Sequence, residues 1–339
     1  MKIGIIGASG TLGRVAVASL LKSGAARSIT ALIRRPDRKL EEIAGCSTIA
    51  GGLFDVPALQ QLVRASDVVV NLAARNPEGQ QKDLESAGDF LELNGLGAAL
   101  VAEVTRRERK PLIHFSTVAV YESGAYEESR LLTEDEPLPA MGLAIESYFA
   151  AAVSVIVDQA ERLRKDGDST LADFPTEAPV YGLTKLIGES CVRAISETVC
   201  CIRMCDVYGP GHESRGVVTD HLEALRTDGR VNVDFDFRST VSFIYIRDVI
   251  VLIALLASRM TGTHDTPKIV NLAGEAVSEA QFAELLRVAA DTADRVGICH
   301  PAGARYDRRY STEVLQRQFP ELSFTPLSNG LRETWLSGS

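Results

Sequence analysis

Hydrophobic residues follow two alternating patterns along the chain. Short runs of consecutive apolar residues are typical of strands buried on both faces, and apolar residues spaced three or four apart are typical of amphipathic helices. The predicted strands are residues 2–6, 28–34, 67–73, 112–120, 199–205, 241–246 and 268–273. The predicted helices are residues 11–24, 57–65, 95–108, 182–197 and 279–293.

This order of elements predicts the fold class. Strands that alternate with helices form right-handed crossovers, so we expect an α/β protein with a Rossmann-type doubly wound parallel sheet. The dinucleotide-binding part is expected over residues 1–206, and residues 241–275 partly return to it. The less regular residues 207–339 are expected to form a smaller C-terminal substrate-binding domain.

Composition narrows the class of protein. The 339 residues are 45% hydrophobic and 24% charged, as in an ordinary soluble globular protein. The net charge of −9 argues against nucleic acid or an anionic membrane as a partner, and we expect neither. The N-terminus reads as a strand and a turn, with no signal peptide and no membrane helix. The six cysteines show no zinc spacing, so we expect no metal and a reduced, cytoplasmic protein.

A glycine-rich turn follows the first strand. It reads Gly7-Ala8-Ser9-Gly10-Thr11-Leu12-Gly13, a GxxGxxG motif between a strand and a helix. Glycines there allow a pyrophosphate to approach the backbone at the positive N-terminus of the helix. The alternative is an ordinary glycine turn, and the position of the motif favours cofactor binding.

The end of the second strand indicates which nicotinamide cofactor is bound. NAD enzymes usually carry an acidic residue there, and NADP enzymes an arginine. This chain has Arg34 and Arg35 and no acid at that place, so we predict NADP, with NAD as the alternative. A solvated basic turn would give the same residues.

Tyr181 and Lys185 form a YxxxK pair. Four residues on a helix place the phenol and the ammonium on one face, where a desolvated cation can lower the pKa of a phenol. The pair alone is a weak signal, because tyrosine and lysine are common neighbours on helix surfaces.

Together these motifs resemble the extended short-chain dehydrogenase/reductases, the NAD-dependent epimerase/dehydratase family. The matching segments follow in the family's order: VVVNLAA (68–74), LNGLGAALVAE with Asn94, HFSTVAVY (114–121), PVYGLTKLIGE, IRMCDVYGPG (202–211) and FIYIRDVI (243–250). The resemblance implies cofactor contacts from Ser9, Gly10, Thr11, Leu12, Leu53, Leu72, Ala73, Ala74 and Asn94, and from Tyr181 and Lys185.

The resemblance also implies the catalytic roles. Tyr181 would exchange a proton with a substrate oxygen, and Lys185 would lower the pKa of Tyr181 and hold the nicotinamide ribose. Thr117, four residues before a tyrosine as in the family, would hydrogen-bond the same oxygen. Without the resemblance, Thr117 reads equally well as an ordinary strand residue.

Several positions depart from the family pattern. The acid pair of the sugar-nucleotide 4,6-dehydratases is replaced by Val118 and Ala119, so we do not expect that reaction. Val241 stands where many members have an arginine that binds the diphosphate. Candidate substrate residues are Asp206, where asparagine is usual, and Arg238 and Arg308, with Arg309 as a further candidate; the adenine-side aspartate is replaced by Gly52.

The largest departure is an insertion over about residues 140–178, between Thr117 and Tyr181. It contains AIESYFAAAVSVIVDQAERLRK, a helical candidate that is apolar on most faces and therefore needs cover. Packing or contact within a homodimer is the interpretation we favour, and a lid over the substrate is the alternative.

The predicted activity is that of an NADP-dependent oxidoreductase acting on a secondary alcohol or ketone. We favour keto-reduction of a nucleotide-activated sugar. A nucleotide-sugar epimerase with bound NAD and a reductase of a non-sugar ketone or aldehyde are alternatives. The non-enzymatic alternative is a cofactor-sensing scaffold, against which the retained Thr117, Tyr181 and Lys185 argue.

Overall fold

A computed structural model gives the fold. It describes residues 1–76, 88–123, 130–136, 177–212, 216–235, 239–262, 265–292, 295–298 and 307–338, with the backbone alone for 122–123, 177–180 and 308. The insertion predicted over about 140–178 therefore lies almost wholly outside the described residues, because 137–176 belong to the omitted ranges.

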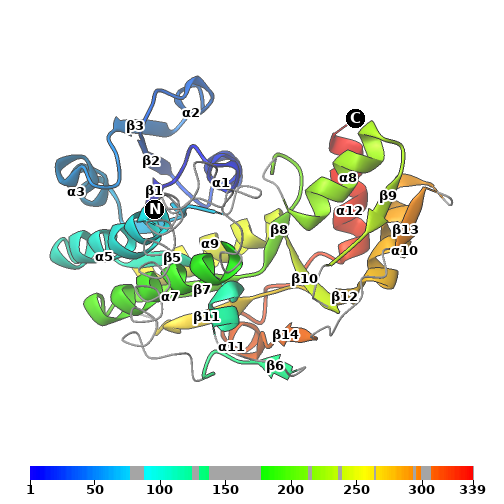
Figure 1. Ribbon diagram of the computed structural model, residues 1–339. Coiled ribbons are helices and arrows are strands. Elements are labelled where there is room, and N and C mark those ends of the chain that lie inside the picture. Colours follow the sequence, from blue (N-terminus) through cyan, green and yellow to red (C-terminus); the bar gives the residue numbers. More distant parts are fainter. Residues whose placement is uncertain are drawn as a thin grey trace, which may run out of the picture.

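Seven parallel strands form the central sheet (Figure 1). In spatial order they are β3 (Cys46–Ala50), β2 (Ser28–Ile33), β1 (Lys2–Ile6), β4 (Val68–Asn71), β5 (Leu112–Thr117), β7 (Val199–Met204) and β11 (Ile269–Leu272). The order reverses between β1 and β4, the point at which open α/β sheets bind their ligands. The predicted Rossmann-type parallel sheet is confirmed.

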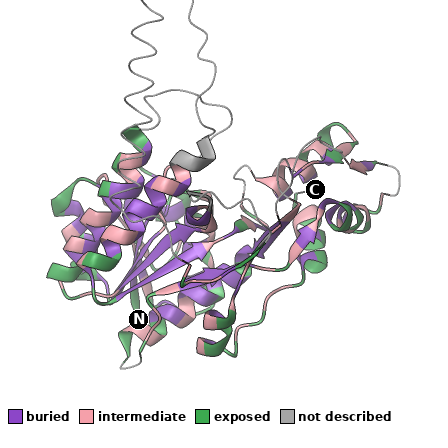
Figure 2. Ribbon diagram, turned by 60° about the horizontal axis from the view of Figure 1, so that its bottom comes forward, coloured by how far each residue is buried: buried purple, intermediate pink, exposed green. Residues whose placement is uncertain are grey.

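Helices cover both faces of this sheet. The helices α1 (Thr11–Lys22), α9 (Ile246–Thr261) and α11 (Glu313–Gln318) pack on one face. The helices α3 (Val56–Ala65), α5 (Ala98–Arg107) and α7 (Glu177–Ile195) pack on the other. Figure 2 shows the buried strands between outer helices that are exposed on their far sides, as two-sided burial of a parallel sheet requires.

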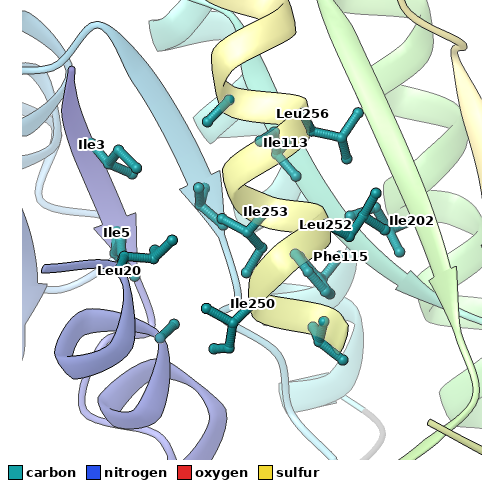
Figure 3. Packing of buried hydrophobic residues seen from close by; sticks show 14 of the residues in the cluster. Ile3, Ile5, Leu20, Ile113, Phe115, Ile202, Ile250, Leu252, Ile253 and Leu256 are labelled. Atoms are coloured by element: carbon teal, nitrogen blue, oxygen red, sulfur yellow. The ribbon is translucent and has the colours of Figure 1, made fainter. Parts of the chain in front are cut away.

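The α9 helix supplies much of the first core. In Figure 3 this helix directs Ile250, Leu252, Ile253 and Leu256 into the cluster. The sheet and α1 supply the other labelled members of the cluster: Ile3, Ile5, Leu20, Ile113, Phe115 and Ile202. Sequence periodicity does not reveal α9, because its apolar residues occupy most faces and follow a predicted strand without a break.

A second, smaller core lies beyond the carboxyl edge of the sheet. It is built on the short strands β8 (Asp206–Tyr208), β10 (Thr240–Tyr245) and β12 (Ala276–Ser278). Phe243 and Phe282 stack at its centre, and the ring of Phe235 packs against both. The remaining elements are α2 (Arg38–Glu41), η1 (Leu91–Gly97), η2 (Val118–Ser123), α8 (Val217–Thr227), α10 (Glu279–Ala290) and α12 (Leu327–Ser337), and the strand pairs β9 (Val231–Val233) with β13 (Val296–Ile298) and β6 (Arg130–Leu132) with β14 (Arg308–Tyr310).

Two predicted strands are three residues shorter than expected. The strand predicted over 67–73 is β4, which covers only Val68–Asn71. The strand predicted over 112–120 ends at Thr117, and residues 118–120 belong to the 3₁₀ turn η2. The backbone N–H of Ala119 donates to Oγ1 of Thr117 over 3.2 Å, which bends the chain at the carboxyl end of the strand. None of the helices among the described residues is both long and apolar enough to cross a membrane.

A buried ion pair fixes α7 to the sheet. The guanidinium of Arg203 in β7 donates to both carboxylate oxygens of Glu189 in α7, at 3.1 and 2.7 Å, and both side chains are at most 2% exposed. Arg203 also donates to the hydroxyl of Tyr121, which donates in turn to Oδ1 of Asn271 over 2.8 Å. The helix α7 is thereby tied to β7, η2 and β11.

Replacement of Glu189 by alanine should destabilise the protein strongly. It would leave the buried Arg203 cation unpaired, which costs about 3–5 kcal/mol. Urea denaturation of Glu189→Ala measures the loss, and Glu103→Ala, which removes an exposed carboxylate paired with Arg106 and Arg107, should cost less than about 1 kcal/mol. Equal losses for the two variants would contradict the role of the buried pair.

Candidate active site

The three predicted catalytic residues meet at the carboxyl edge of the sheet. Thr117 is the last residue of β5, and Tyr181 and Lys185 lie one turn apart on α7. The side chain of Thr117 is hydrogen-bonded to the phenol of Tyr181. The fold therefore joins two groups that are 64 positions apart in the sequence.

Tyr181 is a protonated phenol in this environment. Burial raises its pKa to about 12, against the hydrogen bond from Thr117, and the carboxylate of Asp206 raises it further. The sequence predicts the opposite direction, through Lys185. The prediction is wrong for this structure because burial outweighs the other influences and Lys185 is not among the groups that lower the pKa of Tyr181.

Lys185 is buried against the sheet, with 2% of its side chain exposed. Its ammonium donates to the carbonyl oxygen of Phe115 over 2.5 Å. Burial lowers its pKa to about 8, although the carboxylate of Glu189, one turn further along α7, opposes this shift. A lysine with such a pKa changes its charge within the range in which enzymes work.

Asn94 supports the wall of the site. It lies in η1, a π-helical turn of the kind that often marks functional sites. Its Oδ1 accepts from the N–H of Arg75 over 2.8 Å, and its Nδ2 donates to Arg75 O and to Thr184 Oγ1 over 3.1 and 3.3 Å. Asn94 thus clamps the loop after β4 to α7, and it does not line the cleft that the predicted cofactor residues form.

A cleft of about 750 Å³ runs along the carboxyl ends of β1, β2, β4 and β5 to Tyr181 and Lys185. The predicted residues that line it are Gly7, Ser9, Gly10, Thr11, Leu12, Gly13, Arg34, Leu53, Leu72, Ala73, Ala74, Tyr181 and Lys185. Of the other candidates, Arg35, Thr117 and Asp206 lie outside its lining, Arg238 lies outside the described residues, and the side chain of Arg308 is not described.

The glycine turn has the shape that a dinucleotide requires. Gly7 has φ +83°, and a Cβ at Gly13 would lie 2.2 Å from the carbonyl oxygen of Gly7. These two positions therefore require glycine, and the turn they form lies at the N-terminus of α1, where the positive end of the helix suits a pyrophosphate.

Two buried polar atoms of the cleft wall have no hydrogen-bond partner among the described residues. They are Oγ of Ser116, directly before Thr117, and Nδ1 of His212, in the loop after β8. Such atoms normally find a partner, so they fit a site that takes a polar ligand. Burial lowers the pKa of His212 to about 4, so its imidazole is neutral.

Sequence reasoning missed these two residues and also Arg75, Asn76, Asp89 and Glu92, which line the cleft. Ser116 lies in the segment HFSTVAVY, and His212 directly follows the segment IRMCDVYGPG. Their position near the carboxyl ends of strands could therefore have indicated them. The position of Asp89 and Glu92 depends on how η1 packs, which no local pattern shows. Among the described residues, no group of three or more His, Cys, Asp or Glu side chains could hold a metal ion.

Solved structures share this fold across nearly the whole chain. UDP-glucuronic acid 4-epimerase from Bacillus cereus, in complex with NAD, superposes with a TM-score of 0.71 at 19% identity, covering 99% of this chain and 98% of its own. dTDP-glucose 4,6-dehydratase from Bacillus anthracis, also with NAD, gives 0.70 at 14% identity over 100% and 96%. The NAD-dependent NDP-hexosamine 5,6-dehydratase TunA, involved in tunicamycin biosynthesis, gives 0.70 at 19% identity over 100% and 97%.

Sequence comparison gives the family. No curated protein matches the chain significantly. The model of the NAD dependent epimerase/dehydratase family matches residues 3–142 and 140–273, most of the chain. The glycine turn, the cleft and the joined Thr117, Tyr181 and Lys185 lie within that match, and the chain belongs to the NAD-dependent epimerase/dehydratase family.

Proposed function

We propose that the protein is an NADP(H)-dependent oxidoreductase that reduces a keto group, with a nucleotide-activated sugar as substrate. The observation that carries the proposal is the hydrogen bond between Thr117 and a protonated Tyr181, beside a buried Lys185 and at the end of a cleft that begins with the glycine turn. When bound, the nicotinamide supplies the hydride.

The state of Tyr181 supports the reductive direction. A phenol with a pKa of about 12 holds its proton throughout the neutral range. An alkoxide formed from a ketone is a stronger base than that phenolate, so proton transfer from Tyr181 to the substrate oxygen is downhill. Thr117 can donate to the same oxygen and accept from it, as the oxygen changes from carbonyl to hydroxyl.

The burial of the charged Lys185 side chain also supports the proposal. An ammonium at a buried position destabilises the fold, and such costly groups cluster at functional sites. The ammonium of Lys185 donates to the carbonyl oxygen of Phe115 in β5, and Lys185 and Phe115 both line the cleft. We assign Lys185 to the ribose next to the nicotinamide, which it can hold by donated hydrogen bonds.

Arg34 supports NADP(H). It is exposed, lines the cleft at the end of β2, and forms neither a hydrogen bond nor an ion pair with another described residue. A guanidinium there can bind the ribose 2′-phosphate, whereas a carboxylate would accept hydrogen bonds from the ribose hydroxyls of NAD. In this proposal the pyrophosphate contacts residues 9–13 of the glycine turn, which line the cleft.

The residues after Thr117 argue against a 4,6-dehydratase. Val118 and Ala119 begin η2 and carry no carboxylate that could remove or deliver the proton of an elimination. We therefore propose reduction without loss of water, with Asp206, Arg238 and Arg308 as substrate contacts. Epimerisation is the second candidate, since the family includes epimerases.

We also propose a cytoplasmic homodimer that needs neither nucleic acid nor a membrane. Among the described residues, Cys46, Cys191, Cys200, Cys201 and Cys205 form no disulfide, which suits a reducing compartment. Sedimentation of the purified protein tests the dimer.

Replacement of Tyr181 by phenylalanine should lower kcat about 10²–10⁴-fold, because it removes the proton donor. Turnover is measured as NADPH oxidation with a panel of nucleotide-activated keto sugars, and Kd for NADPH should change by less than about three-fold. Thr117→Val should also lose turnover. Retained activity in Tyr181→Phe would refute the assignment, and isomerised sugar without net NADPH oxidation would favour the epimerase.

Replacement of Arg34 by glutamine should weaken NADPH binding about ten-fold or more and leave NADH binding nearly unchanged. One charge-assisted hydrogen bond to the 2′-phosphate is worth about 1.5–3 kcal/mol. Arg35→Gln is the matched control, because Arg35 does not line the cleft, and it should have a smaller effect. Wild-type protein that binds NADH as tightly as NADPH would contradict the preference.

Replacement of Lys185 by methionine should abolish turnover yet stabilise the fold. Since the folded protein lowers the pKa of Lys185 from 10.5 to about 8, charging it costs about 3 kcal/mol below pH 8. The lost hydrogen bond to Phe115 takes back about 1 kcal/mol, which leaves a gain of about 2 kcal/mol at pH 7.

The gain should shrink as the pH rises from 8 toward 10.5, where the unfolded chain also loses this proton. Urea midpoints at pH 7 and pH 10 measure it. Lys22→Met, at an exposed lysine in the last turn of α1, is the control and should show no such pH dependence. A variant less stable than wild type at pH 7 would show that Lys185 is not a net cost to the fold.

A further inference from the structure

We propose that Arg14 is a specificity-determining residue for the cofactor, because it neutralises Asp37, the one acidic side chain in the basic turn RRPDRK after β2. The inference rests on the proposed NADP(H) preference and assigns it a second residue. Arg14 is not part of the pattern from which the sequence predicts NADP.

The pair is well formed. Nε and Nη2 of Arg14 both donate to Oδ2 of Asp37, at 3.1 and 2.9 Å. The other carboxylate oxygen, Oδ1, accepts from the backbone N–H of Lys39 over 3.2 Å and caps α2. Asp37 is 9% exposed, so both of its oxygens are engaged and the carboxylate is mostly withdrawn from solvent.

The pair joins the two loops that line the cofactor end of the cleft. Arg14 directly follows Gly13, and its backbone N–H donates to Gly10 O over 2.9 Å, so it belongs to the first turn of α1. Asp37 lies three residues after Arg34, which lines the same cleft.

The charges explain what the pair does. With Asp37 neutralised by Arg14, the turn presents the guanidinium of Arg34 to a ligand without a competing carboxylate. Without Arg14, the carboxylate of Asp37 would keep its full charge three residues after Arg34, in the turn proposed to bind the 2′-phosphate, where salt would screen it only in part. It would repel the phosphate, attract Arg34, and suit the ribose hydroxyls of NADH better.

The competing explanation is that the Arg14–Asp37 ion pair only holds the two loops together and has no effect on the charge of the cofactor site. It predicts that loss of either partner weakens both cofactors alike. Neutralisation predicts instead that loss of Arg14 weakens NADPH binding selectively, and that removal of the carboxylate of Asp37, left unpaired by that loss, restores it. A cycle of two single variants and the double variant separates the explanations.

The experiment measures Kd for NADPH and NADH by titration calorimetry in wild type, Arg14→Gln, Asp37→Asn and the double variant. Asparagine at position 37 keeps the capability to cap α2. Arg64→Gln, which breaks an exposed ion pair with Glu108 on the other face of the sheet, is the control. Each titration is done at low and at high salt.

We expect Arg14→Gln to lower the ratio of NADPH to NADH affinity about ten-fold, through NADPH, with a smaller change at high salt. Asp37→Asn alone should not lower the ratio, the double variant should recover it to within about three-fold of wild type, and Arg64→Gln should leave it unchanged.

An unchanged ratio in Arg14→Gln, or an equal loss of both cofactors that Asp37→Asn does not restore, would overturn the inference. The cofactor proposal fails separately, if wild type does not prefer NADPH. The shift of the ratio in Arg14→Gln still decides the role of Arg14 in that case.

Discussion

The buried pair of Glu189 and Arg203 is the interaction on which the geometry of the site depends. It holds α7 against β7, and α7 carries Tyr181 and Lys185. Through the hydroxyl of Tyr121 the same guanidinium reaches η2, the turn that begins directly after Thr117. A single ion pair thus constrains both sides of the hydrogen bond between Thr117 and Tyr181. A buried pair is a poor source of net stability, and here it supplies a fixed orientation.

The site combines groups whose pKa values the fold shifts in different directions, in each case toward the neutral form. Burial keeps the phenol of Tyr181 neutral and makes the ammonium of Lys185 easier to deprotonate. The imidazole of His212 is neutral for the same reason. Tyr181 and Lys185 lie at one end of the cleft, and the guanidinium of Arg34 lies at the end of β2. Arg75, Asp89 and Glu92 line the same cleft, so its wall carries charges of both signs.

Much of the fold could be predicted from sequence, because buried parallel strands are runs of apolar residues and the glycine turn has a fixed place between strand and helix. β3 was not visible, since its residues are only half-buried and show no apolar run. The roles of individual residues were harder. Arg34 and Arg35 are equivalent in the sequence, and their separation depends on the direction in which the turn leaves β2. The pKa of Tyr181 depends on burial and on Asp206, neither of which a four-residue spacing contains. The packing or dimer contact expected of the insertion over 140–178 is not tested, because that segment lies almost wholly outside the described residues.

Three of the passages of the chain between its two cores are very short. β7 ends at Met204 and β8 begins at Asp206, while β10 ends at Tyr245 and α9 begins at Ile246. The third passage, from β11 to β12, takes three residues, and a Cβ at Gly274 within it would lie 2.0 Å from the carbonyl oxygen of Phe243. Hinge motion needs a few residues that are free to change φ and ψ, and these three passages provide hardly any, whereas the passage from α11 to α12 has the eight residues 319–326. The three short passages all leave the carboxyl edge of the sheet, so they hold the second core close to that edge and leave adaptation to ligands of different size mainly to side chains and loops.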